Sequence, residues 1–60
     1  MKSTELNRIA EQEGWLIKRQ TGSHRAYIKN GKLLIIPFHG SKEVPTGTAK
    51  KILKVIKGGE

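Results

Sequence analysis

Hydrophobic residues recur with helical spacing at the start of this chain. Leu6, Ile9 and Ala10 lie three and four positions apart, which places them on one face of a helix. Ser3 is a favourable N-cap, and Gly14 suits the left-handed residue that ends many helices. The pattern predicts an amphipathic helix over residues 4–13, with a narrow apolar stripe that packs on a sheet.

The middle of the chain favours three strands instead. Residues 15–19, 24–29 and 32–38 alternate in polarity or are rich in strand-forming residues, with Trp15 and Ile17 expected to share one side. Residues 21–23 predict a turn. Asn30-Gly31 predicts a two-residue type I′ turn, because both of its central positions need a positive φ.

That two-residue turn sets the register of the second and third strands. It places Lys29 opposite Lys32 and His24 opposite Pro37 and, if the pairing continues, His39 opposite Gly22. One face of the hairpin, which we expect the helices to cover, carries Ala26, Ile28, Leu33 and Ile35. The other face carries Arg25, Tyr27, Lys29, Leu34 and Ile36.

We expect this second face to remain open. Large apolar side chains on an open sheet indicate a protein-binding surface, which we assign to Tyr27, Leu34 and Ile36. The alternative is that scattered apolar side chains on a surface carry no function.

After a loop over residues 39–45, helical spacing returns. Thr46 is a good N-cap for a second helix over about residues 47–57, ended by Gly58-Gly59. Its buried stripe is expected to be Thr48, Ile52, Leu53 and Ile56. The order α-β-β-β-α predicts an α+β two-layer sandwich: a three-stranded antiparallel sheet with both helices on one face. We expect residues 1–60 to form a single domain.

The amino-acid composition excludes several classes of function. The chain has 60 residues and no cysteine, so disulfides and thiolate metal sites are excluded. His24 and His39 lack the further ligands of a closed zinc site, and we expect no metal and no cofactor. The N-terminus carries no targeting signal and no apolar run is long enough for a membrane span, so we expect a cytoplasmic location and no membrane partner.

The positive charge of the chain is the strongest indication of its binding partner. Twelve Lys and Arg against five Asp and Glu give a formal net charge of +7, which favours binding of a polyanion such as RNA. A basic surface that serves solubility alone is the alternative. The expected phosphate contacts are Gly22, Ser23, Lys18, Lys42, Lys50 and Lys51. Arg25 ranks below them, because strand alternation sends it to the face opposite His24.

His24 is the candidate catalytic residue. Histidine exchanges protons near neutral pH, and RNA carries its own nucleophile in the ribose 2′-OH, so a base beside bound RNA can start cleavage without a metal. The alternative is a solvated turn histidine. His39 is the candidate second proton-transfer group, and its alternative is a loop histidine bonded to backbone.

An ordered set of short motifs resembles the HicA family of toxins from bacterial and archaeal toxin–antitoxin pairs. The motifs are Gly14-Trp15, Gly22-Ser23-His24 with Tyr27, Pro37-Phe38-His39-Gly40, Glu43-Val44-Pro45-Thr46-Gly47-Thr48 and Ile52-Leu53-Lys54. The resemblance implies a fold like that of double-stranded-RNA-binding domains, a type II toxin that cleaves mRNA, catalysis by His24, and inhibition by a cognate HicB-type antitoxin.

Two other functions fit the same residues. One is a non-catalytic module that binds double-stranded RNA through shape and phosphates. The other is an adaptor that binds a protein through the open sheet face, independently of His24 and RNA.

Overall fold

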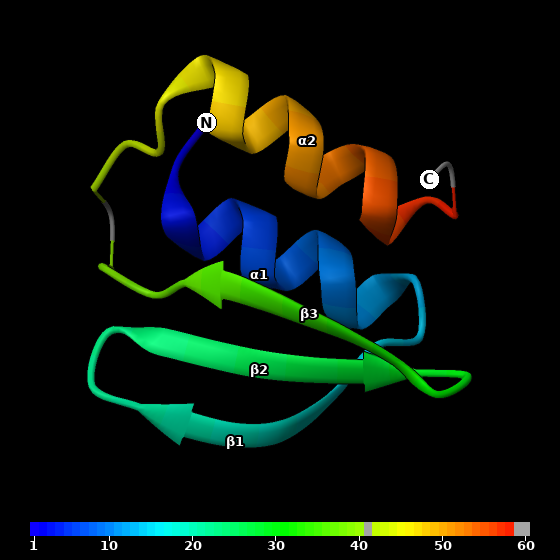
Figure 1. Cartoon of the computed structure of the whole chain (residues 1–60). Helices are drawn as coiled ribbons and strands as arrows, with labels where there is room; N and C mark the ends of the chain where they lie inside the picture. Colours follow the sequence, from blue (N-terminus) through cyan, green and yellow to red (C-terminus); the bar gives the residue numbers. More distant parts are fainter. Residues whose placement is uncertain (41, 59–60) are drawn as a thin grey trace.

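The expected order of elements is confirmed in a computed structural model that describes residues 1–40 and 42–58. The elements are α1 (Ser3–Gln12), β1 (Leu16–Thr21), β2 (His24–Lys29), β3 (Lys32–Pro37) and α2 (Thr46–Ile56). Figure 1 shows both helices on the same side of the sheet. Gly59, expected to help end the second helix, lies outside the described residues.

The sheet has the antiparallel order β1-β2-β3. The predicted register of its second hairpin is confirmed, with Lys29 opposite Lys32 and His24 opposite Pro37. Asn30 and Gly31 have φ angles of 51° and 80°, as a type I′ turn requires. The prediction of which β2 and β3 side chains share a face is therefore confirmed.

The prediction of which face the helices cover was wrong. Tyr27 and Ile36 are fully buried in the core, and Leu34 packs against it partly buried. Leu33 and Ile35 are instead 55% and 52% exposed. Because Tyr27, Leu34 and Ile36 lie under the helices, they cannot form the expected antitoxin-binding surface.

Side-chain length and a polar partner explain this inversion. The Tyr27 hydroxyl donates a 2.7 Å hydrogen bond to Asn7 Oδ1 on α1, so the buried phenol keeps a partner. Arg25 reaches the rim, where its guanidinium lies 3.7 Å from the centre of the Phe38 ring. Lys29 Nζ donates to the Glu13 carbonyl at 2.6 Å. These two long cationic side chains are partly buried and place their charged ends at the edges of the covered face.

Both predicted N-caps were also wrong. The helices begin at Ser3 and Thr46, after Lys2 and Pro45, and neither preceding residue makes a side-chain cap hydrogen bond. Ser3 is buried; its hydroxyl donates to the Pro37 carbonyl at 2.6 Å. Ser3 therefore fastens α1 to the end of β3 rather than capping the helix.

Asn7 strengthens the same attachment. Its Nδ2 donates to the Ser3 carbonyl at 2.7 Å and to the Pro37 carbonyl at 3.1 Å. The Asn7 side chain thus bonds to α1, the end of β3 and, through Tyr27, to β2. This buried polar cluster joins the helix layer to the end of the sheet at which His24 lies.

The core includes residues from both helices and the strands. Its buried members are Leu6, Ala10, Trp15, Tyr27, Ile36, Val44, Ala49, Ile52 and Ile56. Trp15 precedes β1, and its indole N–H donates to the Ile56 carbonyl at 3.1 Å. Ile17 was expected to share a side with Trp15, but it is exposed on the edge strand. Thr48 was expected to be buried, but it is exposed and Ala49 is buried instead.

Within the described residues, no helix has the length and hydropathy that a membrane crossing requires.

We predict that Tyr27→Phe lowers the free energy of unfolding by about 1–3 kcal/mol, because it leaves the buried Asn7 Oδ1 without its donor. Urea denaturation followed by circular dichroism measures this loss. Leu16→Ala, at an exposed position of β1, is the control and should change stability by less than about 0.5 kcal/mol. Equal stability of Tyr27→Phe and the unchanged protein would contradict the assigned role of the hydroxyl.

Candidate functional site

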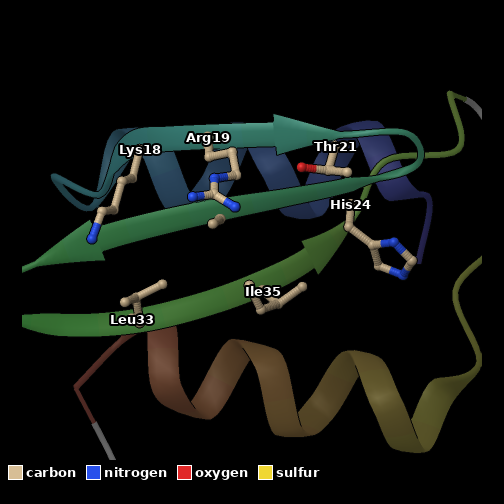
Figure 2. Close-up of a pocket in the computed structure, with 7 residues that line it drawn as sticks. Lys18, Arg19, Thr21, His24, Leu33 and Ile35 are labelled. Atoms are coloured by element: carbon tan, nitrogen blue, oxygen red, sulfur yellow. The ribbon is translucent and has the colours of Figure 1, made fainter.

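The sheet face opposite the helices carries a hollow of about 330 Å³. Its lining residues come from all three strands: Lys18, Arg19, Thr21, His24, Ala26, Leu33 and Ile35. In Figure 2 the side chains of Lys18 and Arg19 extend from β1 towards β2, His24 lies at one end, and Leu33 and Ile35 project from β3. The hollow therefore combines positive charge, an imidazole and an apolar floor.

A β-bulge places two cations side by side at this hollow. Ile17 pairs with Tyr27 and Arg19 pairs with Ala26, which leaves Lys18 as an extra residue in β1. A bulge sets two residues opposite one and breaks the strict alternation of faces. Lys18 and Arg19, which a regular strand would send to opposite faces, therefore both line the hollow.

His24 is held at the end of the hollow by pairing on both sides. It is the first residue of β2 and lies between Thr21 of β1 and Pro37 of β3. The preceding Gly22-Ser23 turn is tied down as well, because the Phe38 N–H donates to the Ser23 carbonyl at 2.6 Å. The His24 side chain is exposed, so a rigid backbone presents a solvent-accessible imidazole.

The charge around the hollow has one sign. None of its lining residues is acidic, whereas Lys18 and Arg19 are basic side chains on one wall. Arg25 lies on the opposite face, as expected, within 4.0 Å of Glu11. A phosphate bound in the hollow would therefore find favourable charge along β1, and an apolar group would find carbon surface on β3.

Not every expected site residue lies at this hollow. Lys18 lines it, and Gly22 and Ser23 form the turn directly before His24. Lys50 and Lys51 are exposed on α2, in the layer on the other face of the sheet, and Lys42 lies in the loop before α2. The structure thus divides the predicted phosphate contacts into a group near His24 and a group away from it.

His39 does not continue the strand pairing to Gly22 as expected. β3 ends at Pro37, and the His39 backbone N–H turns to α1, donating to Ser3 Oγ at 3.0 Å. Its side chain is exposed but is not part of the hollow's lining. The helix contact therefore takes the backbone of His39 out of the sheet.

Sequence reasoning missed five residues that line the hollow. They are Arg19, Thr21, Ala26, Leu33 and Ile35. Thr21 was accessible to inference, because a two-residue turn at Gly22-Ser23 pairs it with His24. Arg19 required the bulge, and the other three required the correct choice of open face. Among residues 1–40 and 42–58, no group of three or more His, Cys, Asp or Glu side chains gathers at a common point.

Comparisons with known proteins agree with the motifs. A family model described as the HicA toxin of bacterial toxin–antitoxin systems matches residues 3–57. A relative from Pseudomonas fluorescens (strain Pf0-1), named as a probable mRNA interferase HicA, is 37% identical over 54 residues. That match covers 90% of this chain and 90% of the relative.

We predict that Lys18→Ala and Arg19→Ala each weaken binding of an RNA oligonucleotide and flatten its salt dependence. Each lost phosphate contact should reduce the slope of log affinity against log salt by about 0.7 for a single strand. Fluorescence anisotropy between low and moderate salt measures both quantities. Lys54→Ala, which removes an exposed cation from α2, is the charge-matched control. Equal effects of all three variants would contradict a local role for the β1 cations.

Proposed function

This chain belongs to the HicA toxin family of bacterial toxin–antitoxin systems, and we propose that His24 is the general base with which it cleaves mRNA. It is a toxin and an endoribonuclease. The observation that carries the proposal is the exposed imidazole of His24 at the end of a hollow lined by Lys18 and Arg19. We propose that residues 1–60 act as one RNA-binding and RNA-cleaving domain.

The reaction begins with removal of the ribose 2′-OH proton by His24. The 2′-oxygen then attacks the adjacent phosphorus, and the bond from phosphorus to the 5′-oxygen breaks. The products are a 2′,3′-cyclic phosphate and a free 5′-OH once the leaving oxygen takes up a proton. The nucleophile belongs to the substrate, so the proposed route is independent of a metal.

The charge that builds on the phosphoryl oxygens needs stabilisation in the transition state. Lys18 and Arg19 line the same hollow as His24, with Arg19 the nearer to it along β1, and we propose that they supply this stabilisation. Gly22, at φ 56°, has open space where a Cβ would lie, so a phosphate can approach the turn closely. The Ser23 hydroxyl adds a donor beside that approach.

We propose His39 as the acid that protonates the leaving 5′-oxygen. It follows Phe38, whose backbone N–H bonds to Ser23, so its backbone is anchored next to the Gly22-Ser23 turn. Its own N–H bond to Ser3 Oγ fixes it further, and its side chain is exposed. His24 and His39 would thus serve the two proton transfers from neighbouring segments.

The partners follow from the family and from the substrate. We propose a cognate antitoxin of the HicB type and an action in the cytoplasm, where bacterial mRNA is found. Lys42, Lys50 and Lys51 are proposed to contact phosphates of a longer RNA beyond the hollow, since all three are exposed cations.

We predict that His24→Ala abolishes RNA cleavage and toxicity on induced expression while it leaves circular dichroism and RNA affinity nearly unchanged. Loss of a general base costs about 10²–10⁴-fold in rate. Labelled RNA incubated with purified protein measures cleavage directly. Retained cleavage by His24→Ala would remove His24 from the mechanism.

Two substrate controls sharpen this test. Cleavage by the unchanged protein should survive EDTA and should fail on a substrate with 2′-deoxyribose at the scissile position. Cutting of the deoxy substrate would exclude attack by the 2′-oxygen. RNA that the unchanged protein retards without shortening would indicate a non-catalytic binding module.

We predict that His39→Ala slows cleavage of ordinary RNA by about 10²-fold or more, as expected for loss of a general acid. Most of that loss should disappear on a substrate whose leaving oxygen is replaced by sulfur, because a thiolate leaves without protonation. His24→Ala should remain inactive on the same sulfur substrate. Single-turnover rates on the two substrates measure the difference. An equal defect of His39→Ala on both would contradict its role as the acid.

A further inference from the structure

The hollow contains an apolar floor that proton transfer and phosphate binding do not use. Leu33 and Ile35 are each about half exposed there, and Ala26 of the central strand pairs with Arg19 on one side and Ile35 on the other. We propose that this floor is a nucleobase subsite, which holds one unpaired base of single-stranded RNA next to the scissile phosphate. The proposal rests on the proposed function and names the form of RNA that the site accepts.

The chemistry of the floor selects an unpaired base. A duplex presents phosphates and hydroxyls to a flat surface, whereas a base outside a stack presents a broad apolar face. The side chains of Ala26, Leu33 and Ile35 consist of carbon and hydrogen alone, so they bury such a face without needing hydrogen bonds. The small side chain of Ala26 between larger neighbours provides the depression.

The order of groups across the sheet matches the parts of one nucleotide. Figure 2 shows Lys18 and Arg19 on β1, the floor across β2 and β3, and His24 at the end. With phosphates on the cations and the base on the floor, the ribose lies between them, and the strand then continues towards His24 at the end of the hollow. Charge complementarity favours RNA over an acidic protein segment, because a nucleotide supplies both the anion and the apolar face.

Single-strandedness also suits the reaction. Attack by the 2′-oxygen requires the 2′-oxygen, phosphorus and 5′-oxygen to lie nearly in line, and the regular backbone of an RNA duplex holds them away from that arrangement. A base drawn onto the floor frees its ribose and phosphate to rotate. Because the floor has no donor or acceptor to read base edges, the subsite should accept all four bases and favour the larger purines.

A double-mutant cycle between Leu33 and the base tests the subsite. The probe is a single-stranded 2′-O-methyl RNA, which the proposed mechanism cannot cleave, with an abasic residue placed in turn at each of three nucleotides around the scissile position. Leu33→Ala should weaken binding of the complete probe by about fivefold, the effect of partial loss of one buried aliphatic side chain. For the probe that lacks the base bound by the floor, Leu33→Ala and the unchanged protein should bind with equal affinity.

Leu16→Ala is the matched control, since Leu16 pairs with Ile28 on the same sheet, is 69% exposed and lies outside the hollow. It should bind every probe like the unchanged protein. A duplex of the same probe should bind several-fold more weakly and should be insensitive to Leu33→Ala.

Two results would overturn the subsite. One is an equal loss for Leu33→Ala on complete and abasic probes, or no loss on either, as expected if the floor binds a protein partner instead. The other is equal binding of duplex and single strand. Both outcomes measure binding to an RNA that is not cleaved. The test of the subsite is therefore separate from the test of His24 as the general base.

Discussion

Tyr27 is packed between the sheet and α1 with its hydroxyl bonded to Asn7, and this packing joins the covered face of the sheet to the core. A phenol buried between sheet and helix is stable only where its hydroxyl keeps a partner, and α1 supplies that partner at 2.7 Å. The opposite side of the pleat, which carries His24, Ala26, Leu33 and Ile35, is left uncovered as a consequence. The position of the candidate site thus follows from which face of the sheet packs against the helices.

The same polar cluster attaches the end of the sheet to α1. Ser3 and Asn7 both donate to the carbonyl of Pro37, and Pro37 pairs with His24. A chain of 60 residues buries only about 60% of the surface that its unfolded form exposes, so its apolar core is small. Satisfied hydrogen bonds at this junction therefore contribute to stability and help to position the backbone of His24, which pairs with Pro37. Within the described residues, no buried side-chain polar atom lacks a partner.

A local irregularity then gives the uncovered face its charge. The bulge at Lys18 brings two cations to the side of β1 that faces the hollow. Without it, that side would have one cation beside the apolar residues of β3. The site combines these cations with an exposed histidine and an aliphatic floor, which is why we infer a nucleotide as the bound unit.

Local signals in the sequence determined much of this protein. The order of elements, the Asn30-Gly31 turn, the pairing of His24 with Pro37, the excess of positive charge and the family motifs all follow from short-range patterns. Three features could be found only in the folded structure. They are the identity of the open sheet face, the bond from Ser3 to the end of β3, and the position of Arg19 beside Lys18 at the hollow. Alternation identifies residues that share a face, but it carries no information on which face a helix covers. That choice depends on partners distant in the sequence, such as Asn7 for Tyr27, and the bulge depends on how two strands align in space.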